Sequence, residues 1–364
     1  MSSPRTPRPV GAEPGTPGRW RGVRRVALLG AVAILCLVGL LASATLQVSE
    51  QLAGRVHRHA DVFTGLDPDA RPPPTRAMTF LFVGTDSASG APVSTPSTRG
   101  ADGPSTGTDA AGSAARPGSR RSDVIMLVQL SADRSAAGVV SVPRDSWVQV
   151  PGLGPNKINA AYAAGGPSLL VHTVESLTHV RIDHFGVIDF AGFRAMTDAL
   201  GGIDVQVART TTFGPITFRA GPNHLDGRRA LAYVRQRKGL PRDDLDRVRR
   251  QQNALRALLD KARSQNMLTN PSRMYGLLDA VTRSVSMDDT LTNSRLRSLA
   301  VQLRGVRDVA FLTAPVAGVG HEGLQAVVHL DPVGCAELWR ALSDGDLGAY
   351  LREHPDDLLP AVPA

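Results

Sequence analysis

MTFLFVG, residues 78–84, is an unbroken apolar run that ends at a glycine, and such a run is typical of a buried β-strand. Two similar runs follow it in the chain, VIMLVQL (124–130) and GVVSVP (138–143). We expect the three strands to share one sheet.

Downstream of these strands the chain alternates between helical and strand patterns. A helix is predicted over 168–177, then a strand HFGVIDF (184–190), a helix over 190–200 and a strand IDVQV (203–207). The later elements are a short helix after residue 227, helices near 244–264, 271–284, 291–304 and 332–342, and strands VAFLTA (309–314) and LQAVVHL (324–330). The order predicts an α/β fold, in which a single domain (77–364) has a central mixed β-sheet flanked by helices.

A low-complexity segment separates the first two strands. Of the 33 residues from 88 to 120, 27 are Gly, Pro, Ser, Thr or Ala, and none is an apolar residue larger than valine. Such a composition cannot bury enough surface to offset the entropy lost on ordering. We predict a disordered insert at 88–120, which is either a flexible flap or an inert loop.

An apolar segment near the N-terminus has the length of a membrane span. Residues 26–46 contain no charged side chain, and a helix of this length crosses roughly 30 Å of hydrocarbon. Arginines crowd its N-terminal side, so residues 1–25 are predicted to be a basic cytoplasmic tail and the domain to lie outside, as in a single-pass type II protein of the cell membrane. The alternative, a cleaved signal peptide ending at Ala42-Ser43-Ala44, has a shorter apolar run of about 7–15 residues. The polar residues 47–76 show no sustained period and are predicted to be a linker.

The composition excludes several classes of protein. The formal charge of +8 includes +5 from residues 1–25, so the domain is near neutral and has no nucleic-acid signature. Cys36 and Cys335 each lack a CxxC partner, which excludes a disulfide scaffold and a cysteine zinc site. No Walker A, HExxH or GxSxG sequence occurs. GVGHEG (318–323) matches GxGxxG, but a strand pattern follows it, so we predict a hairpin loop and not a dinucleotide site.

Two aspartates flank the insert at the ends of predicted strands. Asp86 follows the first strand and Asp123 opens the next one. If these strands are neighbours, the two carboxylates can share Mg²⁺, which prefers oxygen ligands and keeps substrate phosphate in its shell. Taken alone, each aspartate fits a turn or cap residue better than a metal ligand, and Arg121 has the corresponding alternative of a solvated loop charge.

Basic groups follow the third strand. Arg144 and Asp145 come directly after it, where functional groups of α/β folds often lie. Arg144 either binds a phosphate or pairs with a surface carboxylate. Lys157 and Asn159 precede a helix and add a charge and an amide to the same region, although Asn159 also fits a helix start.

The stretch YVRQRKGLPRDDLDRVRRQQ (233–252) carries the densest set of arginines. Arg235 and Arg237 project the same way if the chain is extended there. The residues spaced to share one face of the following helix are Arg247, Arg250 and Gln251, with Asp244 one turn before Arg247. Arginines that converge near a helix N-terminus suit a dianionic or pyrophosphate ligand, and the alternative is a solvated basic helix.

Eight motifs occur in an order and spacing that resemble the LytR-CpsA-Psr (LCP) family. They are GTDS (84–87), RSD (121–123), SVPRDS (141–146), KINAAY with GG (157–166), DHFGVIDFAGF (183–193), DALGGIDV (198–205), HLDGRRALAYVRQR (224–237) and DDLDRVRRQQ (243–252). The resemblance covers roughly residues 78–265, and the arginine-rich composition suits the actinobacterial type of the family.

The resemblance implies a phosphotransferase of the cell envelope, that is, a transferase of phosphorus-containing groups. Such an enzyme moves a glycan phosphate from a polyprenyl-diphosphate carrier to peptidoglycan, where an acceptor hydroxyl attacks the phosphorus attached to the sugar and polyprenyl phosphate leaves. The implied partners are the polyprenyl-diphosphate-linked glycan, peptidoglycan and the membrane, with no nucleic acid. An apolar tunnel between sheet and helices is expected to hold the prenyl tail.

The resemblance also implies roles for individual residues. Asp86 and Asp123 are expected to hold Mg²⁺ on the diphosphate, and Asp244 to orient Arg247. The predicted catalytic residues are Asp86, Asp123, Arg144, Arg235 and Arg237, and the predicted substrate-binding residues are Arg121, Lys157, Asp244, Arg247, Arg250 and Gln251.

Alternatives stay open for one phosphate contact, for the reaction and for the general base. Ser87-Ala88-Ser89 stands where the family often has an arginine, so one phosphate contact is missing or comes from Arg120. The same arginines and Mg²⁺ would also serve a polyprenyl-diphosphate hydrolase, in which water replaces the sugar hydroxyl. A non-catalytic envelope regulator or transcription attenuator is the third reading. The general base is open among Asp86, Asp123 and Asp145.

Overall fold

A computed structural model describes residues 56–85, 122–264, 271–303 and 305–363. Its centre is a seven-stranded sheet with the strand order β1-β12-β7-β2-β3-β4-β13. The strands are β1 (His57–His59), β2 (Met78–Thr85), β3 (Ser122–Leu130), β4 (Ala136–Ser141), β7 (His184–Asp189), β12 (Val285–Asp288) and β13 (Asp308–Thr313). The sheet is mixed, because β2 is antiparallel to β3 and parallel to β7, and β4 is antiparallel to β3 and parallel to β13. The prediction that the first three strands share a mixed sheet is confirmed.

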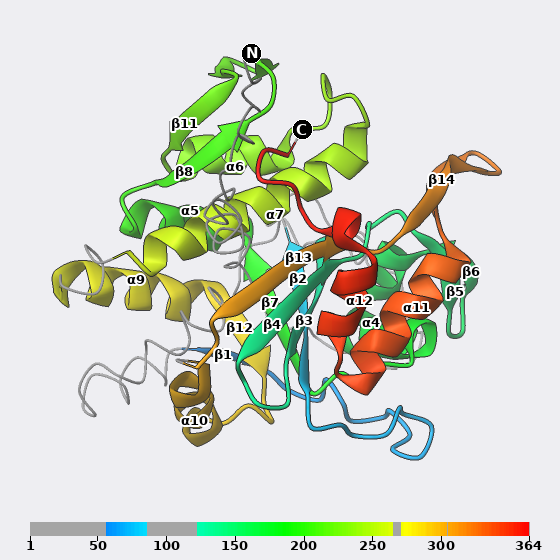
Figure 1. The fold of residues 1–364 in the computed structure, drawn as a ribbon. Helices are drawn as coiled ribbons and strands as arrows, with labels where there is room; N and C mark the ends of the chain where they lie inside the picture. Colours follow the sequence, from blue (N-terminus) through cyan, green and yellow to red (C-terminus); the bar gives the residue numbers. More distant parts are fainter. Residues whose placement is uncertain (1–55, 86–121, 265–270, 304, 364) are drawn as a thin grey trace, which may run out of the picture.

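Both faces of the sheet are covered by helices (Figure 1). Successive residues of β2 point to opposite faces, so Phe80 and Phe82 belong to one apolar core, and Leu81 and Val83 belong to the other. The helices α5 (Phe190–Ala199), α6 (Gly227–Arg235), α7 (Asp243–Ala262), α9 (Pro271–Ser284) and α10 (Asn293–Leu303) build the first core. The second core takes its helical side chains from α4 (Ile158–Thr178), α11 (Pro332–Asp344) and α12 (Leu347–Glu353). A sheet buried on both faces explains why its strands read as continuous apolar runs.

Four two-stranded antiparallel ribbons extend from this framework in the described residues, and three of them are hairpins. They are β5 (Trp147–Val150) with β6 (Gly154–Lys157), β8 (Ile203–Val207) with β11 (Gly221–Leu225), β9 (Thr211–Phe213) with β10 (Ile216–Phe218), and β14 (Val316–Glu322) with β15 (Gln325–Leu330). The GxGxxG sequence lies in the last hairpin, where Gly323 takes the left-handed conformation (φ 60°) that the turn requires. The hairpin interpretation is therefore confirmed. A short 3₁₀ helix, Pro355–Asp357, follows α12.

The helix predicted over 168–177 begins ten residues earlier in the structure. In α4 the backbone of Gly166 leaves helical geometry (φ 62°, ψ −151°) immediately before Pro167, and the helix continues on both sides. Glycine and proline together are a strong breaker signal, and that signal hid the first turns of the helix from the sequence pattern. The chain also contains α12, a helix that the sequence analysis did not predict.

The N-terminal tail, the predicted membrane helix (26–46) and the predicted insert (88–120) lie outside the described residues. Within the described ranges, no helix is long and apolar enough to cross a membrane.

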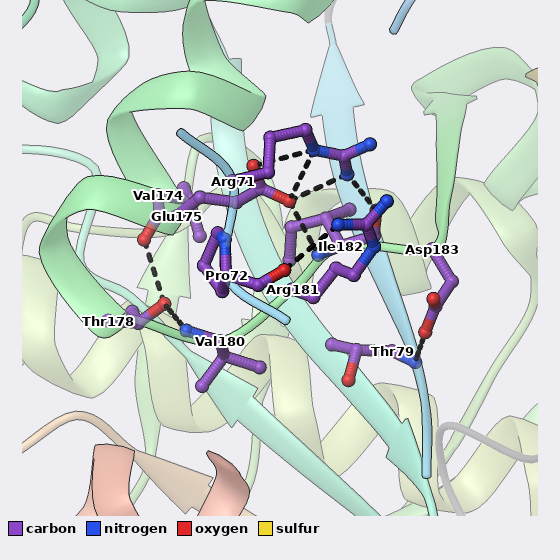
Figure 2. A network of polar contacts seen from close by, with 10 residues as sticks. All are labelled: Arg71, Pro72, Thr79, Val174, Glu175, Thr178, Val180, Arg181, Ile182 and Asp183. Atoms are coloured by element: carbon purple, nitrogen blue, oxygen red, sulfur yellow. Dashed lines mark hydrogen bonds and ion pairs between the residues drawn. The ribbon is translucent and has the colours of Figure 1, made fainter. Parts of the chain in front are cut away.

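Residues 56–76, predicted as part of a linker, pack against the domain. Val62 is buried in the second core, and Arg71 donates hydrogen bonds of 3.0 and 2.7 Å to Glu175 of α4 (Figure 2). Arg71 also donates to the carbonyl of Ile182, and Arg181 donates to that of Pro72. The linker prediction is wrong for this part, because β1 pairs with β12 in the central sheet and the rest of the segment is held by single side chains and not by a periodic apolar face.

Candidate active site

The candidate site lies at the end of the sheet where β2 and β4 end and β3 begins. Thr85, the last residue of β2, pairs with Ser122, the first residue of β3. The sequence prediction that these strands are neighbours is therefore confirmed. Asp123 is the next residue of β3, and Arg144 follows the end of β4 by three positions.

Four charged side chains meet at this end of the sheet. The Nη1 of Arg144 forms an ion pair with Oδ1 of Asp123, and its Nε lies 3.6 Å from Oδ2 of Asp145. Lys157 places its Nζ 3.2 Å from Oδ1 of Asp145. Lys157 is held there because it pairs with Trp147 across the β5–β6 hairpin. Two cations and two carboxylates thus alternate, and each of the four side chains is between 14% and 23% exposed.

The first turn of α7 brings a second group of charges. Asp244 accepts a hydrogen bond of 2.9 Å from Nη2 of Arg247, whose side chain is 5% exposed. The Oδ1 of Asp244 lies 3.2 Å from Nε of Arg237. Asp244 is therefore shared between two arginines. The contact with Arg247 was predicted from the spacing of one helical turn between the two residues.

The two groups act on each other electrostatically. Burial raises the pKa of Asp244, and the charges of Arg247 and Arg144 oppose this shift. Burial lowers the pKa of Arg247. The charges of Asp244 and Asp123 oppose this shift, and that of Arg144 adds to it. We refer to the joined set as the site cluster, which comprises Asp123, Arg144, Asp145, Lys157, Arg237, Asp244 and Arg247.

Four buried polar atoms around the site cluster have no hydrogen-bond partner in the described part of the chain. They are Nε of Arg144, Nε of Arg247, Oγ of Ser122 and Oγ of Ser146. Buried donors without partners are rare in folded proteins, since each costs free energy that a hydrogen bond would offset. Two of the four belong to guanidinium groups, which match the oxygens of a phosphate or carboxylate. The cluster is thus suited to bind an oxyanion.

Arg235 and Gln251 lie beside the cluster with different contacts. Arg235 is the last residue of α6, so the condition for Arg235 and Arg237 to project the same way, an extended chain, is not met at Arg235. Its guanidinium lies 4.5 Å from the centre of the Phe190 ring at the start of α5. Gln251 donates a hydrogen bond of 3.3 Å to the carbonyl of Val234, which ties α7 to α6.

The structure does not bring Arg250 to the cluster. Its side chain is fully buried, and it donates hydrogen bonds to Gln236 (2.6 Å) and Thr211 (2.9 Å) while stacking 4.6 Å from the Tyr233 ring. The prediction of a shared face with Arg247 is therefore wrong for Arg250. The i, i+3 spacing leaves an angle of about 60° between two side chains, and here that angle separates the site from the core.

Asp86 and Arg121, the remaining predicted site residues, lie outside the described residues. The described residues contain no group of three His, Cys, Asp or Glu side chains that could hold a metal ion. Asp123 is the described member of the predicted metal pair.

Two supporting contacts were missed by the sequence analysis. Gln252 donates hydrogen bonds to Oγ of Ser141 (2.9 Å) and to the carbonyl of Leu312 (2.6 Å), which fastens α7 to the end of the sheet. The amide of Val328 in β15 donates to the carbonyl of Asp145 (2.9 Å). Gln252 adjoins Gln251 in the RRQQ motif, so its type and place gave a signal, whereas a backbone contact leaves none in the sequence.

Comparison with known families gives a match over most of the chain. The model of the LytR_cpsA_psr family matches residues 55–334. The chain belongs to the LytR_cpsA_psr family. The resemblance found in the eight motifs is thereby confirmed, and the match begins where the described fold begins.

Individual members of the LytR_cpsA_psr family show the same relationship. The cell wall biosynthesis protein LcpA of Corynebacterium glutamicum is 35% identical in an alignment of 242 residues that covers 57% of this chain and 46% of LcpA. The polyisoprenyl-teichoic acid–peptidoglycan teichoic acid transferase TagU of Oceanobacillus iheyensis is 33% identical in an alignment of 194 residues that covers 52% of this chain and 59% of TagU. The chain thus spans about half the length of these curated relatives. The crystal structure of B. subtilis TagV superposes with a TM-score of 0.56 at 25% identity, covering 75% of this chain and 98% of TagV.

Proposed function

We propose that the protein is a phosphotransferase that moves a glycan phosphate from a polyprenyl-diphosphate carrier to peptidoglycan. The observation that carries this proposal is the pair of buried guanidinium groups, Arg144 and Arg247, whose Nε atoms make no hydrogen bond within the described ranges. The name of the TagU relative, a transferase that links teichoic acid to peptidoglycan, supports the choice of reaction.

The cluster would bind the diphosphate through its cations. Arg144 and Arg247 are the most buried of these and would bind the phosphoryl group that is transferred. Arg237 and Lys157 are more exposed and would neutralise the outer oxygens. An acceptor hydroxyl forms the new bond to phosphorus as the bond to the bridging oxygen breaks, and polyprenyl phosphate leaves with that oxygen. The hydroxyl proton passes to a carboxylate of the site, for which Asp86, Asp123 and Asp145 are the candidates.

One carboxylate at the end of the sheet where β2 ends and β3 begins, that of Asp123, supports the proposal of a Mg²⁺ site. Asp123 carries a carboxylate in an ion pair with Arg144, and carboxylate oxygens are the ligands that this hard cation prefers. We propose that Asp123 holds the ion together with Asp86. A bound Mg²⁺ would neutralise the charge of the diphosphate.

The proposed location of this chemistry is the outer face of the cell membrane. The apolar residues 26–46 would anchor the chain, with the arginine-rich tail in the cytoplasm. The site would then face the lipid-linked substrate and the wall on the same side.

Transfer of a labelled glycan tests the proposal directly. The full chain in detergent is given a labelled polyprenyl-diphosphate glycan and peptidoglycan, with Mg²⁺ or with a chelator. We expect label on peptidoglycan only with Mg²⁺, and a loss of at least about 100-fold in Asp123→Asn. Asp308→Asn, an exposed residue of β13, is the control and should keep wild-type transfer. Label released as soluble glycan phosphate would instead identify a hydrolase, and no metal-dependent turnover would favour a regulator.

Asp244 is expected to set the acid limb of the pH dependence of transfer. Burial raises its pKa above the ordinary 3.8, so as the pH falls its charge is lost earlier than that of an exposed aspartate. Arg237 and Arg247 then lose their shared partner. In Asp244→Asn the charge is absent at every pH, so the wild type should exceed this variant about tenfold at pH 7.5 and approach it at acid pH.

The neighbouring Asp243→Asn, at an exposed position, should keep the wild-type profile. An unchanged acid limb in Asp244→Asn would show that another group controls the titration.

A further inference from the structure

A cavity of about 390 Å³ lies at the opposite end of the sheet from the site cluster. Its walls come from the segment before β2, the β3–β4 turn, the start of β7 and α10. Strand β2 runs from Met78 at this cavity to Thr85 at the candidate site, a length of roughly 25 Å at the usual rise per strand residue. A ligand in the cavity therefore cannot touch the site cluster.

Three arginines line the cavity and form no ion pair with a carboxylate of the described residues, while the charges of Asp183 and Asp133 act on Arg134 from a greater distance. Arg134 donates to neutral oxygens only, namely the carbonyls of Ser131 and Arg76 and the side-chain oxygen of Gln302. The guanidinium of Arg295 donates to the carbonyl of Thr290. Within the described part of the chain, the guanidinium of Arg76 makes no hydrogen bond or ion pair. The three cations thus keep donors for an anion.

Two other titratable groups line the same cavity. Asp183 accepts a hydrogen bond of 2.8 Å from the amide of Thr79, which leaves it capacity for a further donor. The Nδ1 of His184 lies 3.2 Å from Oδ2 of Asp288, which does not line the cavity, so this ring nitrogen already has a hydrogen-bond partner. The lining therefore combines an excess of cations with one carboxylate acceptor. The floor includes the apolar side chains of Leu291 and Leu299.

We propose that this cavity binds a small polyhydroxylated anion, such as a sugar phosphate or a sugar acid. Arg76, Arg134 and Arg295 would bind the phosphate or carboxylate oxygens, since guanidinium groups form charge-assisted hydrogen bonds with both. Asp183 would accept a hydroxyl of the ligand, and the apolar floor would contact its carbon skeleton. The volume lies within the range of about 300–1,000 Å³ that is usual for small-molecule sites.

Calorimetric titration of the full chain in detergent tests this site without any enzymatic assay. Glycerol 3-phosphate and N-acetylmuramic acid are the probes, and the one that binds more tightly identifies a phosphate or a carboxylate as the preferred group. Both tests are made in an Arg247→Ala background, which weakens oxyanion binding at the site cluster, and the cavity variants below distinguish what remains there from binding in the cavity. We expect saturable binding of at least one probe there.

The variant Arg76→Gln/Arg295→Gln should weaken this binding at least about tenfold, because it removes two charge-assisted contacts. Both residues are exposed, so the fold should be retained, which thermal unfolding would verify. Arg340→Gln, an exposed arginine of α11, removes a charge elsewhere and should leave the affinity unchanged. The proposal is overturned if neither probe saturates, if the double variant binds like its parent, or if Arg340→Gln weakens binding equally.

Discussion

Replacing Arg247 by alanine is expected to lower the rate of transfer at least about 100-fold, the size of effect seen when one donor to a developing oxyanion is removed. Arg247 is 5% exposed, its Nη2 is held by Asp244, and its Nε has no partner in the described structure. A buried guanidinium in this state is oriented before substrate binds. The loss of transfer should therefore appear as a lower kcat, which is measured with saturating labelled glycan.

The control for this prediction is Arg249→Ala, two positions further along α7. Arg249 is partly exposed, and its electrostatic neighbours are Arg242 and Asp246, which do not belong to the site cluster. We expect near-wild-type transfer from this variant. Arg247→Lys keeps a charge but loses the planar fork, so it should recover only part of the rate. If the alanine variants at 247 and 249 behaved alike, Arg247 would have no direct role in transfer.

Replacing Arg71 by alanine is expected to lower the free energy of unfolding by about 3–5 kcal/mol. Arg71 and Glu175 are 12% and 3% exposed, and the guanidinium donates to both oxygens of the carboxylate (Figure 2). Without Arg71, Glu175 keeps one other donor, the amide of Ile182, and its charge stays buried. The result is measured by urea unfolding of the full chain in detergent.

Two further variants separate a buried charge from a lost contact. Arg71→Met/Glu175→Gln removes both charges and should regain a large part of the lost stability, because a neutral pair carries no desolvation penalty. Arg194→Ala removes an exposed i, i+4 pair with Asp198, separated by 3.8 Å, and should cost less than about 1 kcal/mol. Equal losses for Arg71→Ala and Arg194→Ala would show that the Arg71 pair contributes no more than a surface pair.

Five strands of the sheet, β2, β3, β4, β7 and β13, were predictable because strands buried on both faces read as apolar runs, whereas the short strands β1 and β12 were not predicted. The helices with regular spacing were predicted within a few residues, as α5 and α11 show. The segment around Arg71 could not be predicted, because it is bound by isolated side chains whose partners lie about 100 residues away in the sequence. Local periodicity contains no information about such contacts.

The candidate site was predicted in its residue types and only partly in its geometry. Asp123 lies at the start of β3, Arg144 follows the end of β4 and Lys157 ends the β5–β6 hairpin, and the topology of the sheet brings such strand ends together. Arg247 and Arg250 have equivalent sequence signals but point to different surroundings. The difference depends on how α7 is rotated against the sheet, and that rotation is set by tertiary contacts such as those of Gln252.

The pairing of Thr85 with Ser122 has a consequence for comparing members of the family. The sheet itself fixes the two ends of the connection between β2 and β3. The free energy of closing a flexible loop grows only with the logarithm of its length, by about 0.6 kcal/mol for each doubling. Natural variation in length at this point can therefore accumulate with little selection against it, so a large gap in an alignment here gives no evidence of a different activity.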